Sequence, residues 1–354
     1  MTYSRFAAIV LAGGSLFAAS LFAQQRELSF ESAGDFLAMP ADLHFGEVAG
    51  VATTSRGNLL VYFQGGGPNA TIGAARVHIN GGPRLVEFDR SGKFQREIGG
   101  ANPNNRPYSF LFAQGVRVDT QDNIWVVDRA SRMVVKFDQA GKVLLTLGRR
   151  LEAVGELGSS GVFGRASGPP GSGVPGDNFN QPTDVAWDST GNIFISDGYG
   201  NARVAKFDKN GKFIKSWGAT GTQSGQFNTP HSVAVDAGGN VYVADMGNQR
   251  IQVFDNNGTF KSEIKNVGSP RALCISPGAH QYLYSSNSNP TDDPFLGGEI
   301  YKMELDGSVL GKFGKAGKQL KEFGMVNEID CRDPNTLYVA ELMNWRVQKL
   351  TLKN

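Results

Sequence analysis

Four side chains able to do chemistry stand at equivalent points of a repeating sequence, namely Gln114, His231, Arg271 and Asn327, and a fifth, Tyr199, lies in a turn of one copy. An imidazole can carry a proton or bind a metal ion, a guanidinium binds anions, and carboxamides donate and accept hydrogen bonds. Gln114, His231 and Asn327 fall in alternate repeats, so in a ring of repeats they would face one axis at threefold spacing. The set predicts a polar site on that axis, for a small polar ligand or the end of a peptide.

The elements that would position this site come from the repeat itself. Clear copies begin at Gly115, Asp184 and Ser232, a more worn copy begins near Glu328, and weaker copies begin near Val48 and Ala272. Each copy alternates apolar and polar residues in short runs separated by turn residues, which is the period of a β-strand. A repeating unit that holds four such strands is typical of a propeller blade. We therefore predict an all-β fold, a six-bladed β-propeller of four-stranded antiparallel blades.

The hairpins and the ends of the chain carry further signals. An aromatic residue followed by Asp and then Gly recurs at the third turn of the blades, as in Phe207-Asp208-Lys209-Asn210-Gly211, which suits a tight hairpin. The aromatic residue is expected to pack between sheets. The last copy ends at Leu352 without a fourth strand. We expect the extended segment Arg26–Glu31 to supply that strand and close the ring. In this arrangement the innermost strands begin at Ala49, Gln114, Thr183, His231, Arg271 and Asn327.

Two insertions interrupt the repeat, at Gln64–Pro83 and at Arg149–Gln181. Both are too long for ordinary hairpins, so they would lie on a face of the propeller. Two interpretations stay open: a surface that binds a ligand or a protein partner, and a mobile loop.

The first 23 residues resemble a targeting signal. Arg5 precedes an apolar run from Phe6 to Phe22, and Ala23 ends the segment, in the order of a secretory signal peptide. An uncleaved membrane anchor is the alternative. We expect one mature domain, 24–354, in the periplasm or outside the cell and without membrane association after cleavage. The formal net charge of +2 argues against a nucleic-acid partner.

The cysteine and tryptophan residues allow two interpretations each. Cys274 and Cys331 lie in neighbouring repeats of an exported chain, where a disulfide can form. Innermost strands of adjacent blades usually diverge, so we favour two buried thiols. The four tryptophans are expected to pack between blades inside strands rather than to form a sugar-stacking platform: Trp125, Trp187, Trp217 and Trp345.

A motif of the form D-x-x-N-x-R, seen at Asp245–Arg250 and with Glu at Glu341–Arg346, resembles the NHL repeat. Its acid and arginine are expected to hold the turn between the second and third strands. The stretches Gln181–Ala186, Ser196–Arg203 and Gly225–Ser232 carry a closer resemblance, to the peptidyl-α-hydroxyglycine α-amidating lyases.

That resemblance implies a zinc ion held by three histidines at the starts of alternate innermost strands, a tyrosine base and arginines that orient the substrate. Here only His231 keeps the histidine, whereas Gln114 and Asn327 replace the other two. Amide oxygens are poor zinc ligands, so zinc is doubtful. Tyr199 and Met325 match the catalytic site of the family, and the arginine positions are Gln64 and Met246.

The resemblance also implies a structural calcium ion, held by one carboxylate and two backbone carbonyls. Glu328 stands at the carboxylate position, and Val51 and Val116 stand at the carbonyl positions. A glutamate is compatible with Ca²⁺.

Three functions follow as hypotheses. The first is a binding module whose channel mouth holds a small polar ligand or peptide. The second is a metal-dependent carbon–oxygen lyase of the peptidylamidoglycolate lyase type, or a hydrolase, with Tyr199 as base and His231 and Glu328 near a divalent ion. The third is a protein-interaction scaffold that uses the two insertions.

Overall fold

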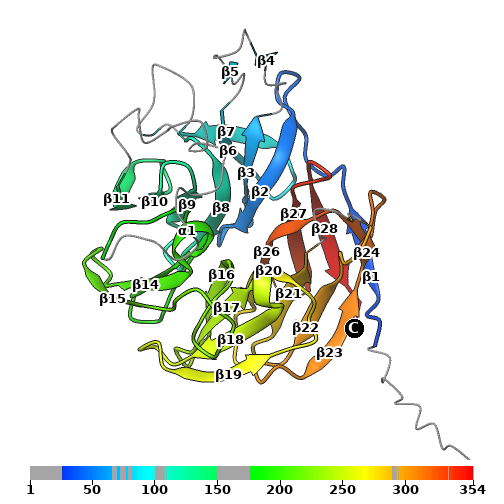
Figure 1. The fold of residues 1–354 in the computed structure, drawn as a ribbon. Helices are drawn as coiled ribbons and strands as arrows, with labels where there is room; N and C mark the ends of the chain where they lie inside the picture. The colour runs from blue at the N-terminus through cyan, green and yellow to red at the C-terminus, as the bar shows by residue number, and fades with distance from the viewer. Residues whose placement is uncertain are drawn as a thin grey trace, which may run out of the picture.

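The computed structural model describes residues 26–65, 70–71, 77–78, 82–99, 108, 110–149, 176–288, 293, 295–333 and 335–353. Six four-stranded antiparallel sheets surround a central axis, with strands such as β15, β19 and β23 at the rim (Figure 1). The predicted six-bladed β-propeller is thus confirmed.

The strands of each blade follow one another outward from the axis. Blades one and two are β2 (Phe45–Thr53), β3 (Leu59–Gly65), β6 (Arg84–Phe88), β7 (Phe94–Ile98), then β8 (Ala113–Val118), β9 (Ile124–Asp128), β10 (Met133–Phe137), β11 (Val143–Gly148). Blades three and four are β12 (Asp184–Trp187), β13 (Ile193–Asp197), β14 (Arg203–Phe207), β15 (Phe213–Trp217), then β16 (Pro230–Val235), β17 (Val241–Asp245), β18 (Arg250–Phe254), β19 (Phe260–Ile264). Blades five and six are β20 (Pro270–Ile275), β21 (Leu283–Asn287), β22 (Ile300–Met303), β23 (Val309–Phe313), then β26 (Val326–Asp333), β27 (Thr336–Glu341), β28 (Arg346–Leu352), β1 (Phe30–Ala33). Short elements in the connections are β4 (Ala70–Thr71), β5 (Val77–His78), α1 (Gly198–Asn201), η2 (Met246–Asn248), β24 (Lys315–Ala316) and β25 (Glu322–Phe323).

The innermost strands form a closed ring, because β2, β8, β12, β16, β20 and β26 each contact the next and β26 contacts β2. All six run in the same direction along the axis, since each blade repeats the same strand order. We call the end at which they begin the entry face and the end at which they finish the exit face.

The ring is closed by the N-terminal segment, as predicted, but with a shifted register. β1 pairs with β28 from Phe30↔Leu352 to Ala33↔Lys349, and so provides the outer strand of blade six. The predicted segment Arg26–Glu31 is therefore wrong by a few residues. Its first part instead lies along blade five, where Leu28 N and Arg26 O bond to Lys312 of β23. One segment thus binds two blades and covers their exposed edges.

The repeated turn between the third and fourth strands is held by its aspartate, as in blade three. There Asp208 Oδ1 accepts the amide hydrogens of Asn210 and Lys212, and Gly211 N donates to the carbonyl of Asp208. Gly211 has φ = 84°, which favours glycine. The preceding aromatic residue, Phe207, is buried against the neighbouring blade, as expected.

The structural role expected of the NHL motif is also confirmed. Asp245 is fully buried, and its carboxylate accepts hydrogen bonds from Asn248, from Arg250 and from the amide of Asn228. Arg250 in turn donates to the carbonyls of Gln223 and Gln226 in the preceding loop. In blades four and six the motif therefore fastens the blade to the connection that enters it.

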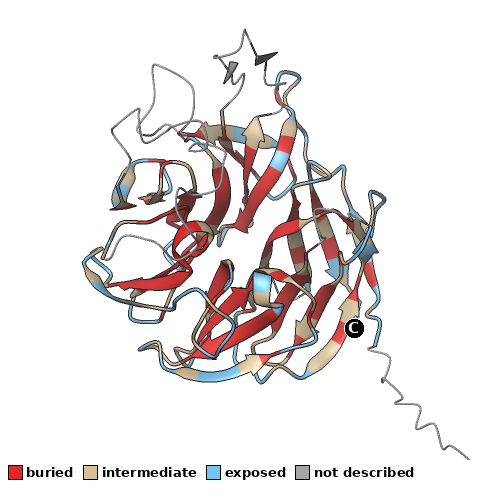
Figure 2. Ribbon diagram, viewed as in Figure 1, coloured by how far each residue is buried: buried red, intermediate tan, exposed pale blue. Residues whose placement is uncertain are grey.

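Apolar side chains fill the spaces between blades, and the exposed residues gather at the rim and in the turns (Figure 2). Trp125 and Trp187 stack across blades two and three with ring centroids 5.9 Å apart, as interblade packing predicts. The prediction was wrong for Trp345, which ends the turn before β28 with φ = 52° and is 57 % exposed.

The prediction of two free thiols was also wrong. Cys274 of β20 and Cys331 of β26 form a disulfide, with their Cα atoms 6.0 Å apart. Neighbouring blades diverge toward the rim, whereas their innermost strands stay in contact along the channel. A pair at the same height on two adjacent innermost strands is therefore within disulfide reach.

The predicted signal peptide and most of both insertions, Gln64–Pro83 and Arg149–Gln181, lie outside the described residues. In the described part of the chain, no helix has the length and apolar character needed to cross a membrane.

Candidate functional site

His231 lies at the centre of the predicted site, at the start of β16 on the entry face. Its Nε2 atom is 3.3 Å from Gln114 Nε2 and 3.2 Å from the Tyr199 hydroxyl. Its Nδ1 atom is 3.0 Å from the carbonyl oxygen of Arg271, so a proton on Nδ1 would be donated there and Nε2 would be an acceptor. The structure thus brings the predicted imidazole, phenol and amide together.

The charge state of His231 follows from its surroundings. The side chain is buried, and burial is the main reason that its pKa lies well below the usual 6.5. The guanidiniums of Arg271 and Arg129 lower the pKa further. His231 is therefore a neutral imidazole at physiological pH.

Arg271 extends over the site from the start of β20. Its Nε donates to Asn327 Oδ1 at 2.9 Å, and Nη2 donates to the Tyr199 hydroxyl at 3.2 Å. The Asn327 amide nitrogen donates to the carbonyls of Ala49 and Gln114. The Asn327 side chain thus holds Arg271 and the innermost strands, and these bonds occupy its amide instead of a ligand.

Arg129 is the residue that the sequence reasoning missed. It follows β9 directly, and its guanidinium carbon lies 4.0 Å from the centroid of the Tyr199 ring and 5.0 Å from that of Phe112. A cation over an aromatic face is attracted by the ring. The position of Arg129 in the repeat could have revealed it, because Arg129 directly follows β9 just as Met246 directly follows β17.

The remaining predicted residues lie around this group. Gln64 Oε1 accepts the amide hydrogen of Ala113 at 3.1 Å, which fixes the start of blade two. Met246 Sδ is 3.8 Å from Arg271 Nη1. Met325 precedes β26 with φ = 54°, and its carbonyl accepts the amide hydrogen of Leu342. These residues shape the wall of the site and supply no acid or base.

Comparison with known proteins agrees with the repeat and the blades. The NHL repeat profile matches residues 179–207 and 227–254. The mouse protein "NHL repeat-containing protein 3" is 30 % identical to this chain, over 75 % of the chain and 72 % of the mouse protein. The chain belongs to the NHL-repeat family.

Among the relatives of this NHL propeller are proteins named for amidation. Rat peptidylglycine alpha-amidating monooxygenase is 31 % identical over 87 % of the chain and 30 % of the rat protein. A probable peptidyl-alpha-hydroxyglycine alpha-amidating lyase of Caenorhabditis elegans is 28 % identical over 87 % of the chain and 83 % of the worm protein. The chain spans about a third of the length of the first curated relatives it matches. A solved gluconolactonase structure from Xanthomonas campestris shares the fold, with a TM-score of 0.56, 14 % identity and coverage of 94 % and 96 % of the two chains.

The residues at the three zinc positions do not fit a zinc ion. Only His231 offers an imidazole, and Asn327 is held away from it by Arg271 and by two backbone carbonyls. Gln114 presents an amide to Nε2 of His231, and the Tyr199 hydroxyl beside that atom accepts a hydrogen bond from the Arg271 guanidinium. Within the described residues, no group of three or more His, Cys, Asp or Glu is arranged to hold a metal ion. The site therefore does not match the zinc centre that the resemblance implies.

The calcium position is occupied by a different arrangement, which we call the hub. Oε2 of the buried Glu328 accepts the amide hydrogens of Val51 and Val116, at 3.2 Å and 3.0 Å. Its Oε1 lies 2.8 Å from Nε of Arg117. The predicted ligands Val51 and Val116 thus direct donors, not carbonyl oxygens, at the carboxylate. That set suits a carboxylate paired with a guanidinium, and backbone N–H groups are not calcium ligands.

Arg117 connects the blades at the hub. Its guanidinium binds both oxygens of Asp184, at 3.0 and 2.7 Å, and donates to the carbonyls of Leu273 and Ile329. Burial disfavours its charge, but Asp184 and Glu328 outweigh that effect and hold the pKa of Arg117 above its usual value. The same burial raises the pKa of Glu328 to about 8, although Arg117 acts in the opposite direction. Arg117 therefore supplies a positive charge among the buried carboxyl groups of the hub.

Proposed function

We propose that the entry face binds a small ligand through its carboxylate, such as the C-terminal end of a peptide or an N-acyl amino acid. The observation that carries this proposal is the pair Arg129 and Arg271. Among the described residues neither guanidinium pairs with a carboxylate, and both lie against the ring or hydroxyl of Tyr199. With His231 neutral, the two cations leave the site with a positive charge that an anion would balance.

The rest of the group supplies the polar contacts that orient such a ligand. Arg271 has Nη hydrogens beyond those used for Tyr199 and Met246, and a guanidinium can bind a carboxylate through two parallel hydrogen bonds. Gln114 and Tyr199 offer an amide and a hydroxyl next to the imidazole, which suits the amide group of a peptide. The family resemblance to proteins named for peptidyl-α-hydroxyglycine supports the same ligand class.

Calorimetric titration with N-benzoylglycine and with its uncharged amide tests this proposal. We expect the acid to bind and the amide to bind at least roughly tenfold more weakly, because loss of a charge-assisted hydrogen bond costs about 1.5–3 kcal/mol. Arg271→Met and Arg129→Met should each weaken binding of the acid. Arg90→Met serves as the control, because Arg90 is exposed in a turn of blade one on the exit face. Equal affinity for acid and amide would contradict the proposal.

A second candidate function is a lyase acting on peptidyl-α-hydroxyglycine, and Tyr199 favours it. In that reaction a base removes the hydroxyl proton, a carbonyl forms, the carbon–nitrogen bond breaks and the amide nitrogen takes up a proton. The bond broken is thus carbon–nitrogen rather than carbon–oxygen. The Tyr199 side chain lies between His231 and Arg271 and, as a phenolate, would be the group that accepts the proton.

Release of glyoxylate from N-benzoyl-α-hydroxyglycine, with and without added Zn²⁺, tests the second candidate. We expect any turnover to be lost in Tyr199→Phe. Binding of N-benzoylglycine without glyoxylate release would leave the protein as a binding module.

We further propose that the protein acts outside the cytoplasm. The N-terminal pattern of residues 1–23 and the Cys274–Cys331 disulfide support this location, since disulfides persist in oxidising compartments. Fractionation of cells that express the full chain tests it, with N-terminal sequencing of the exported form.

A further inference from the structure

We propose that the exit face holds a second binding site, for a neutral oligosaccharide, in which the Trp187 indole is the stacking platform. Two cavities open there, of about 760 Å³ and about 440 Å³. Both are lined by Trp187, Thr120 and Val235, so they meet at these residues. They lie at the opposite end of the channel from His231, and the hub separates the two ends.

Trp187 is the tryptophan whose unused indole N–H lies at the two cavities. It ends β12 and is half-buried, with its ring stacked at an interplanar angle of 22° on the buried ring of Trp125. Its indole N–H has no hydrogen-bond partner among the described residues, whereas Trp125 Nε1 donates to Asp119. An indole with one covered side, one side on a cavity and a free donor suits a partner that offers both an apolar face and hydroxyl groups. A pyranose ring has both.

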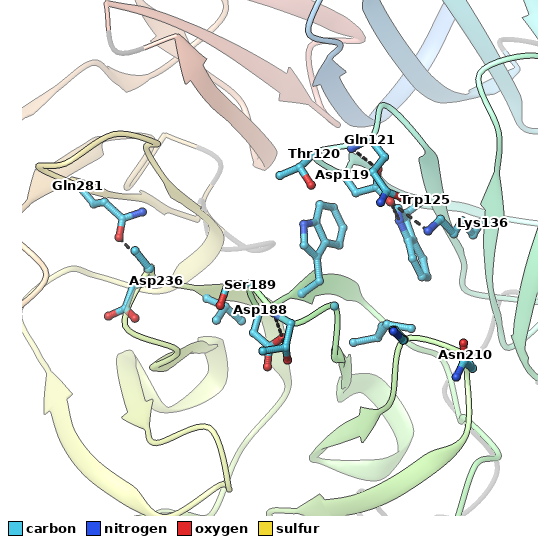
Figure 3. Close-up of a pocket in the computed structure, with 17 residues that line it drawn as sticks. Asp119, Thr120, Gln121, Trp125, Lys136, Asp188, Ser189, Asn210, Asp236 and Gln281 are labelled. Atoms are coloured by element: carbon cyan, nitrogen blue, oxygen red, sulfur yellow. Dashed lines mark hydrogen bonds and ion pairs between the residues drawn. The ribbon is translucent and has the colours of Figure 1, made fainter.

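The polar residues of the larger cavity favour a neutral ligand over a charged one. Its three aspartates are already bonded within the protein: Asp119 to Asn123 and Lys136, Asp188 to Thr190 and Asn192, and Asp236 to Asn240 and Tyr242. Figure 3 shows Asp119 with Trp125 and Lys136 on one side of the cavity and Asp188 and Ser189 on the other. The three carboxylates therefore already have hydrogen-bond or ion-pair partners within the protein.

The groups left for a ligand are mostly uncharged and exposed. Thr120, Gln121, Ser189 and Asn210 offer hydroxyls and amides from turns of blades two and three. Lys209 is the exposed cation of the larger cavity. A ring of hydroxyl and amide groups around an indole can satisfy the hydroxyls of a sugar, each of which donates and accepts. The volume of the larger cavity allows more than one sugar unit.

Titration of tryptophan fluorescence with neutral trisaccharides, namely cellotriose, triacetylchitotriose, maltotriose, xylotriose and mannotriose, tests the proposal. We expect at least one to change the emission in a saturable way at millimolar concentration or below. Trp187→Phe should weaken that binding by roughly threefold and Trp187→Ala by roughly tenfold, because aromatic contacts are worth about 0.5–1.5 kcal/mol beyond area burial. Trp345→Phe is the matched control, since Trp345 is exposed outside both cavities.

Trp187→Ala also removes the stack on Trp125, so a second variant is needed. Asn210→Ala changes an exposed turn side chain of the cavity, and its backbone bond to Asp208 is kept. It should reduce affinity for the same sugar while the melting temperature stays at the wild-type value. Absence of saturable binding for all five sugars would overturn the proposal, as would binding that neither Trp187→Ala nor Asn210→Ala weakens. Binding of N-benzoylglycine at the entry face should be unchanged in both variants.

Discussion

Two regions of the same channel use arginine in opposite ways. At the hub, Arg117 is surrounded by Asp184, Glu328 and backbone carbonyls, so its charge is compensated on every side. At the entry face, Arg129 and Arg271 are partly buried and, among the described residues, neither forms an ion pair, although Glu47 is near enough to act on the charge of Arg129. The comparison separates stability from function within one fold. The ion-paired arginine of the hub holds the blades together, whereas the two arginines of the entry face that form no ion pair are available to bind an anionic ligand.

The largest expected effect comes from removing the hub cation. Arg117→Met leaves the carboxylate of Asp184 buried without its partner, and breaking a buried ion pair costs about 3–5 kcal/mol. We expect unfolding by urea at neutral pH to show a loss of that size, with the m-value unchanged. Arg84→Met is the control, because Arg84 pairs with Glu97 on partly exposed strands of blade one. A loss no larger than that of the control would show that the hub is not a structural centre.

The disulfide sharpens the comparison, because Cys274 and Cys331 fasten the exit end of the channel beside the hub. The two residues are 57 apart in sequence, and closing a loop of that length contributes roughly 4 kcal/mol by constraining the unfolded chain, a contribution that real proteins often fall short of. Cys274→Ser with Cys331→Ser should therefore lower stability by about 2–4 kcal/mol. Affinity for N-benzoylglycine at the entry face should change little. A large loss of affinity would show that the two ends of the channel are coupled.

At the entry face we expect the opposite pattern, namely a small effect on stability and a large effect on ligand binding. Arg129→Met and Arg271→Met should change the unfolding free energy by less than about 1 kcal/mol, or raise it, since an uncompensated, partly buried charge costs stability. Both should weaken binding of N-benzoylglycine by roughly tenfold or more. A loss of stability similar to that of Arg117→Met would remove the distinction between the two regions.

The sequence predicted most of the fold, because strand period, turn residues and the repeat all act locally. It predicted six blades, the buried aromatic of the turns and closure by the N-terminal segment. It misplaced β1 by a few residues, since Arg26–Leu28 and Phe30–Ala33 are both extended. The two segments differ only in the strand that each one meets, β23 of blade five or β28 of blade six. The disulfide was missed because its geometry depends on the spacing of β20 and β26, which no local pattern encodes.

The candidate site was predicted in part for the same reason. His231, Gln114, Arg271 and Asn327 were found by their equal positions at strand starts. Arg129 comes from the end of β9 and meets Tyr199 from the next blade, so only the packing of two blades brings it into the site. The repeat shows which residues are equivalent, and it does not show which long side chains cross from one blade to another.

The smallest expected effect concerns His231 and acid. In the folded protein its pKa lies well below 6.5, because burial and the nearby Arg271 and Arg129 oppose a positive charge. As pH falls through about 6.5, His231 binds a proton in the unfolded chain but stays neutral in the folded protein. His231 therefore lowers the free energy of unfolding at acid pH. Each unit of pH between 6.5 and the folded pKa costs up to about 1.4 kcal/mol. The raised pKa of Glu328 acts in the opposite sense, because the folded state there holds its proton up to about pH 8.

His231→Gln isolates this effect, and glutamine already occupies the equivalent position at Gln114. Urea unfolding of the two proteins at about pH 7 and pH 5 should show the wild type losing more stability than the variant, by about 1–2 kcal/mol, since one proton is involved. The contribution of Glu328 is common to both proteins and cancels in the difference. An equal loss would mean that His231 takes up its proton in the folded state. The entry face would then carry a third positive charge, and its affinity for carboxylates would rise in acid instead of staying constant.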